Sequence, residues 1–386
     1  MDEVVVSENV VDKAMVDMSA AVNVDPAVAA QYMGQIAELQ KQIEIMKRTH
    51  VPMVLTFQQT IDMPPQPKES LYGQSCNNDS VTVSHWATKW LDHTRINAQS
   101  HDVINNSTML DYGKYACRPV IVAGSGPSLK KNAHHLAGRP KEIGLVSCLH
   151  NFAYFTDLNV PCDGYVNLDA GDITIPEMSQ GGKHPESYYW DATKDATLIA
   201  GIVSKPELVD RWKGRVLWFN SPVPDMLYME QSTKLCPLEV FYNVGGNALG
   251  AAYYHARAVL GGMPIVMIGA DFAFDYTRKF HSWDSPYDAQ FQGVVPLTDV
   301  FGNRVYTWPS YNNFCSWFNH QSMGGNGNNP MLMINCTEGG TLGAFPNGNM
   351  RQIIQMALVD LLAMYSHHKM LPDCVKGDPT KPKLLF

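Results

Sequence analysis

Short apolar runs alternate with turns and helical segments throughout the part of the chain that begins at Arg118. These runs lie at 119–124, 142–148, 164–169, 197–203, 215–220 and 264–271. Continuous apolar runs of this length are typical of strands that are buried on both faces of a parallel sheet. Strands that alternate with helices indicate an α/β fold. We therefore expect a mainly parallel sheet with helices on both faces, and ligand-binding groups just after the strands.

The remainder of the 386-residue chain divides into two further segments. Residues 1–50 are expected to form an N-terminal helical arm, whose apolar residues over 26–48 have the spacing of a short coiled coil. Self-association explains this seam, and so does a single helix that lies on the domain. Residues 51–117 are expected to be a linker and a helical lead-in, followed by the α/β domain at 118–386.

Two smaller predictions concern helices at either end of this α/β domain. Within the lead-in, residues 51–80 are interpreted as a linker or an irregular loop, and 85–98 as a helix with Trp86 and Trp90 on one side. We interpret both tryptophans as packing residues rather than as a platform for stacking bases. A final helix is expected over 349–367.

Composition argues against several classes of protein. The chain has 29 Lys and Arg against 37 Asp and Glu, a net charge of −8, whereas nucleic-acid binding usually needs a basic face. Its longest nearly apolar stretch, 258–270, is shorter than the roughly 20 residues that span a bilayer. The acidic start differs from a signal peptide, and the 8 cysteines form no C-x-x-C pair. We expect a cytoplasmic protein with reduced cysteines, bound neither to nucleic acid nor to membrane.

The strongest local motif follows the first apolar run. It consists of Gly124, Ser125, Gly126, Pro127 and Ser128. Glycines let the backbone approach a ligand closely, and the amide groups at the start of a helix favour phosphate. Leu129 occupies the third glycine position of the dinucleotide fingerprint, and the loop is not a Walker A motif. A phosphate-binding loop and a tight turn without a ligand both fit this pattern.

Other polar groups follow the later strands. They are Asn151, Asp169, the group of Gly245, Gly246 and Asn247, and then Asp271, His281 and Glu338. Asn151 suits a base or ribose, and equally a turn. Asp169 suits a ribose, a metal or an acceptor, and equally a helix cap. His281 suits acid–base chemistry near neutral pH, and Glu338 suits a metal or a proton, or else a turn that braces the sheet edge.

The order of four segments carries a family resemblance. They are RPVIVAGSGPSLKKN, YVNLDAGD, MIGADFAFDYTRKFHSWD and INCTEGGTLGA, spread over roughly 95–365. In this order they resemble the Maf (motility-associated factor) family of flagellin glycosyltransferases, which shares a domain family with archaeal hydroxymethyl-dihydropterin diphosphokinases. The first segment and GADF also resemble bacterial sialyltransferases that use CMP-sialic acid and have a Rossmann-like sheet.

This resemblance implies transfer of a nonulosonic, sialic-acid-like sugar from a CMP-activated donor to a hydroxyl of a protein or glycan acceptor. It implies that His281, Asp271 and Glu338 are catalytic, with His281 acting as acid or base. It implies that the nucleotide is bound by Gly124, Ser125, Gly126, Pro127, Ser128, Asn151, Asp169, Gly245, Gly246 and Asn247. A divalent metal, Mg²⁺ or Mn²⁺, is compatible with the carboxylates, but its ligands are not defined.

Two alternatives and one partner remain open at this stage. The archaeal relatives suggest ATP-dependent diphosphoryl transfer to a pterin-like alcohol, which requires Mg²⁺. A nucleotide-binding structural protein without catalysis is the other alternative. The seam over 26–48 adds the expectation of a homo-oligomer.

Overall fold

The computed structural model describes residues 68–223, 225–283, 291–322, 332–344 and 353–368. They belong to one compact unit, Pro64–Phe386. The expected N-terminal arm and its helix over 26–48 lie outside the described residues, so their structure and any self-association stay predictions.

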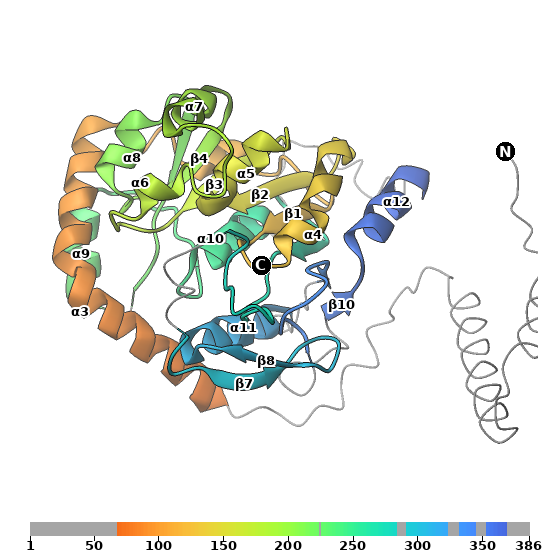
Figure 1. Cartoon of the computed structure of the whole chain (residues 1–386). Coiled ribbons are helices and arrows are strands. Elements are labelled where there is room, and N and C mark those ends of the chain that lie inside the picture. Colours follow the sequence, from red (N-terminus) through yellow and green to blue (C-terminus); the bar gives the residue numbers. More distant parts are fainter. Residues whose placement is uncertain (1–67, 224, 284–290, 323–331, 345–352, 369–386) are drawn as a thin grey trace, which may run out of the picture. The chain divides into compact units, whose positions relative to one another are not determined.

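A single eight-stranded sheet organises the fold, with strand order β10-β9-β6-β1-β2-β3-β4-β5 and parallel pairing throughout (Figure 1). Its strands are β1 Val120–Ala123, β2 Gly144–Cys148, β3 Gly164–Asn167, β4 Thr197–Gly201, β5 Arg215–Phe219, β6 Ile265–Ile268, β9 Met333–Asn335 and β10 Ile353–Gln355. Each apolar run singled out in the sequence contains one of these strands. The chain builds the sheet outward from β1 to β5 and then returns to place β6 on the other side of β1, which is a doubly wound, Rossmann-like arrangement.

Both faces of the sheet are covered by helices, as predicted. The helices are α3 Lys68–Ser100, α4 Leu129–Asn132, α5 Phe152–Asp157, α6 Thr174–Glu177, α7 Glu186–Ala192, α8 Pro206–Arg211, α9 Met226–Leu235, α10 Ala248–Tyr254 with a π-helical extension His255–Val259, α11 Pro309–Ser322 and α12 Leu358–His368. Within β1, Ile121 and Ala123 pack into one hydrophobic cluster, and Val120 and Val122 pack into the other. Successive side chains of a strand point to opposite faces, so an uninterrupted apolar run serves both clusters.

Two local predictions need correction, and one pair of strands was not predicted. The expected final helix over 349–367 is wrong at its start, because Ile353–Gln355 forms strand β10 beside β9 and the helix begins at Leu358. The loop expected up to residue 80 is wrong from Lys68 onward, since α3 already begins there. A hairpin of β7 Val295–Thr298 and β8 Arg304–Thr307 forms a separate two-stranded sheet that the sequence did not suggest.

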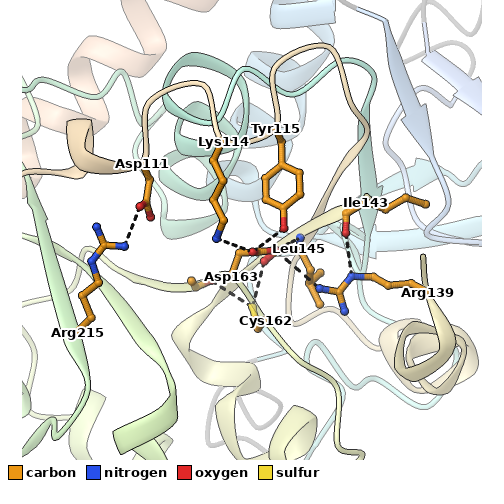
Figure 2. A network of polar contacts seen from close by, with 10 residues as sticks. Asp111, Lys114, Tyr115, Arg139, Ile143, Leu145, Cys162, Asp163 and Arg215 are labelled. Carbon is orange, nitrogen blue, oxygen red and sulfur yellow. Dashed lines mark hydrogen bonds and ion pairs between the residues drawn. The ribbon is translucent and has the colours of Figure 1, made fainter. Parts of the chain in front are cut away.

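The amino-terminal edge of the sheet is held by a polar network centred on Asp163, the residue before β3 (Figure 2). Its carboxylate accepts hydrogen bonds from Lys114 Nζ at 2.9 Å, Tyr115 Oη at 2.7 Å and the Leu145 amide at 2.8 Å. The Arg139 guanidinium lies 3.7 Å away. This network ties the segment before β1 to β2 and β3.

No helix among the described residues has the length and apolarity needed to cross a bilayer.

Candidate functional site

The carboxyl ends of β1 and β6 meet at the point where the strand order reverses, which is where open α/β sheets bind ligands. Glycines let the segments that follow β1 and β6 approach each other closely here. A Cβ on Gly124 would lie 2.5 Å from Gly269 O, and one on Gly126 would lie 2.1 Å from Asp271 Oδ2. This close approach of the segments after β1 and β6 therefore requires glycine at 124 and 126, whether or not a ligand binds.

Asp271 is bonded to the same loop from the other strand. Its carboxylate accepts from Ser128 Oγ at 2.7 Å and from the Ser128 amide at 3.2 Å, and the residue is 5% exposed. Burial raises the pKa of Asp271 to about 7, although the Ser128 hydrogen bonds and nearby Lys131 oppose this shift. One amide at the start of α4 is thus already occupied by a carboxylate of the chain. Phosphate binding by Gly124, Ser125, Gly126, Pro127 and Ser128 stays a prediction.

The segment that carries His281 is fastened to this loop by Ser282. The Ser282 amide donates to Ser125 O at 3.0 Å, and its hydroxyl donates to Gly126 O. The structure therefore brings His281, predicted from the sequence, to the side of the glycine loop.

A second histidine, which the sequence did not single out, lies beside His281. The ring centroids of His150 and His281 are 5.2 Å apart. Trp283 Nε1 donates to His150 Nε2 at 2.7 Å, and the Gln180 amide oxygen lies 2.6 Å from the same nitrogen. Burial lowers the pKa of His281 to about 4, and burial together with His281 lowers that of His150 to about 3. Both imidazoles are therefore neutral at pH 7.

Asn151 lies beneath the loop rather than on its surface. It is 0% exposed, and its Nδ2 donates to Gly124 O at 3.0 Å and to Ser147 Oγ at 2.9 Å. In this position Asn151 fixes the end of β1, and contact with a base stays a prediction.

Glu338 follows β9 in the left-handed backbone region, with φ of 58°. Its Oε1 accepts from the Leu358 amide at 3.1 Å and from Asn132 Nδ2 at 3.2 Å. The carboxylate therefore joins the start of α12 to α4, which is the bracing role that the sequence left open beside a catalytic one. The catalytic role stays a prediction.

The other predicted residues gather farther along the same edge, around a cavity of about 410 Å³. This volume is within the range of small-molecule pockets. Its walls come from the ends of β3, β4 and β5, from α3 and α9, and from the segment before α10. They include Asp169, Gly245, Gly246 and Asn247, together with Trp86, Trp90, Asn220 and Tyr228. Asn247 also caps α10 by accepting from the Gly250 amide at 2.8 Å.

The two tryptophans of α3 are cavity residues that we had interpreted as packing residues. That interpretation holds in part for Trp90, which packs against one hydrophobic cluster. Trp86 belongs to neither of the two clusters of described residues and is half-buried. Their spacing of four along a helix was a signal that both face the same side.

Glu177, the last residue of α6, was not predicted from the sequence. Burial, with a smaller contribution from Asp169 of the cavity, raises the pKa of Glu177 to about 8. Three residues later, Gln180 reaches His150. A carboxyl group that is protonated at neutral pH therefore lies at the carboxyl edge of the sheet. No motif marks it, because its pKa depends on burial.

Across the described part of the chain, no three His, Cys, Asp or Glu side chains form a group that could hold a metal ion. Dependence on Mg²⁺ or Mn²⁺ stays a prediction.

Comparisons with known proteins found one family match and one similar solved structure. Residues 92–277 match the family described as 6-hydroxymethylpterin diphosphokinase MptE-like, which belongs to the group that the sequence motifs resemble. A solved structure of a Maf glycosyltransferase from Magnetospirillum magneticum AMB-1 is similar to the chain with a TM-score of 0.45 and 14% identity. The match covers 69% of this chain, and this chain spans 38% of the length of that protein. No curated protein matches the sequence.

Proposed function

We propose that the chain is a glycosyltransferase that moves a nonulosonic sugar from a CMP-activated donor to a hydroxyl acceptor on a protein or glycan. The family supports the coarser statement, a glycosyltransferase-like or pterin diphosphokinase-like protein. The observation that carries the finer proposal is the pair of neutral, half-buried histidines held against the glycine loop where the strand order reverses.

His281 is the general base in this proposal. The acceptor oxygen attacks the anomeric carbon, its proton moves to a neutral imidazole nitrogen, and the bond from that carbon to the phosphate oxygen breaks. CMP leaves with the electron pair. A histidine whose pKa is lowered to about 4 is a neutral imidazole at pH 7, which suits a proton acceptor rather than an imidazolium proton donor. The proposal therefore chooses base over acid, a choice that the sequence left open.

Replacement of His281 tests this role. We expect His281→Ala to lower kcat by roughly 10²- to 10⁴-fold with a CMP-sugar donor, while calorimetry finds CMP affinity unchanged. His184→Ala is the control, since His184 is exposed and contacts Asp157 and Tyr188 rather than the glycine loop. Loss of CMP binding in the His281 variant, or retention of full turnover, would show that the assigned role is wrong.

A second candidate is ATP-dependent diphosphoryl transfer to a pterin-like alcohol, which the name of the matched family favours. That chemistry uses Mg²⁺ to neutralise the phosphates. A ligand that binds only the native state raises the melting temperature by mass action. Thermal shifts with CMP alone would support sugar transfer, whereas shifts with ATP that EDTA abolishes would support the diphosphokinase.

A further inference from the structure

Helix α3 forms a fixed wall of the cavity. His93 Nδ1 lies 3.0 Å from Val203 O, and Asn97 Nδ2 donates to Ile202 O and Ser204 O, each at 2.9 Å. These carbonyls directly follow β4, and Asn97 is 0% exposed. Because buried hydrogen bonds of this kind hold a helix in one position, the side chains one and two turns earlier have a defined place at the cavity.

The surface that α3 turns toward the cavity is aromatic. Trp86 and Trp90 are one helical turn apart and both line it. Tyr228 of α9 packs edge-on against Trp90, with ring centroids 5.8 Å apart and an interplanar angle of 67°. Trp86 makes ring contacts with neighbouring His85 and Lys89 but belongs to neither hydrophobic cluster. The packing of the described core therefore does not explain the position of the Trp86 indole.

A buried amide lies in the wall formed by the end of β5. Asn220 is 2% exposed and its backbone is fixed on both sides, by Val240 O and by the Tyr242 amide. Its Oδ1 accepts from the Ser221 amide at 2.8 Å. Asn220 lines the cavity, and its side-chain amide carries two N–H donors. The cavity thus offers N–H donors to an acceptor atom on the edge of a ligand.

From this arrangement we infer that the cavity binds a planar nitrogen heterocycle, stacked on Trp86 and Trp90, with an acceptor edge toward Asn220. The inference rests on the proposed function, because the ring is either the base of the donor nucleotide or a pterin acceptor. Stacking on indole is favourable for any such ring, and edge hydrogen bonds supply selectivity. Both tryptophans precede residue 92, so this wall lies outside the segment that matches the family.

Trp86→Ala is the decisive variant, since Trp86, unlike Trp90, is not packed in the core. We would measure calorimetric affinities for CMP, ATP and 6-hydroxymethylpterin. Wherever the wild type binds, we expect Trp86→Ala to weaken binding by about 5- to 100-fold. Trp86→Phe, which keeps a π face, should restore most of it. Tyr112→Ala is the matched control, because Tyr112 is 47% exposed and lies before β1, near the opposite edge of the sheet. Melting curves check that each variant is folded.

The outcomes separate this inference from the proposed function. CMP binding that depends on Trp86 supports both. CMP binding that is equal in wild type and Trp86→Ala overturns the aromatic site and leaves sugar transfer standing. Binding of only ATP or the pterin, dependent on Trp86, supports the site and overturns sugar transfer. A wild-type chain that binds none of these rings overturns both.

Discussion

Carboxyl groups at the two ends of the parallel strands have different surroundings. At the amino-terminal edge, Asp163 is surrounded by donors, namely Lys114, Tyr115, the Leu145 amide and the nearby Arg139 (Figure 2). At the carboxyl edge, neither Asp271 nor Glu177 has an ion-pair partner among the described residues, and burial raises the pKa of each. The charge of Asp163 is neutralised within the fold, whereas the raised pKa of Asp271 and of Glu177 lies near neutral pH.

This difference separates a structural network from a candidate site. Ion pairs and hydrogen bonds stabilise an ionised carboxylate and hold it in one state. Desolvation without a cation raises the pKa toward neutrality, where a carboxyl group can exchange a proton. Asp163 and Asp271 both flank strands of one sheet, so the surroundings of a carboxyl group, rather than its residue type or its place beside a strand, decide its role.

Loss of the Asp163 carboxylate is expected to have the largest effect on stability. Asp163→Ala leaves Lys114, Arg139 and the Leu145 amide without their acceptor, and should lower the free energy of unfolding by about 2–4 kcal/mol. Urea unfolding measures this change. Asp191→Ala, which removes an exposed ion pair with Lys213, should change stability little. Equal effects of the two substitutions would mean that the network is not structural.

Gly126→Ala tests the close approach of the segments that follow β1 and β6. The added methyl would lie 2.1 Å from Asp271 Oδ2 and 2.7 Å from Gly269 O, so we expect a loss of about 1–3 kcal/mol. The matched control is Gly138→Ala, because a Cβ there meets nothing within 4 Å. If both variants unfold at the same urea concentration as the wild type, the segments after β1 and β6 do not approach each other as closely as described.

Titration of Glu177 has an effect of similar size, spread over several pH units, and probes the contrast directly. Folding raises its pKa from 4.5 to about 8, so its contribution to stability is complete below pH 4.5 and is lost as the pH rises toward 8. Between pH 5 and 9, Glu177→Gln should remove a decline of about 1–3 kcal/mol, allowing for residual solvent contact. Asp271 adds a decline of the same sign up to about pH 7, so the measured quantity is the difference between variant and wild type. Parallel stability curves would contradict the raised pKa.

Much of the sheet was predictable because a buried parallel strand leaves a strong local signal. The run 119–124 is apolar without interruption since Val120 and Ile121 face different hydrophobic clusters. Strand β10 was missed because Ile353–Gln355 is short and gains its structure by pairing with β9. Pairing between distant segments has no local signature, so this region was predicted to be helical.

The candidate site was predictable only as a set of residue types at strand ends. Sequence position placed Asp271 and His281 after β6, and the structure brings both to the glycine loop. It gave no reason to single out His150 or Glu177, whose chemistry arises from burial and from their neighbours. It also led us to interpret Trp86 as a packing residue, whereas the structure places it in the cavity wall with Asp169.

The sequence by itself determined the α/β class, the parallel strands and the edge of the sheet at which polar groups collect. These follow from the period of the apolar residues and from turn chemistry, which act over a few residues. The tertiary structure decided which polar groups meet, which carboxyls lose their solvent and which tryptophans face a cavity. Those properties depend on contacts such as Ser128 with Asp271, between residues far apart in the chain, and on the low dielectric that surrounds them.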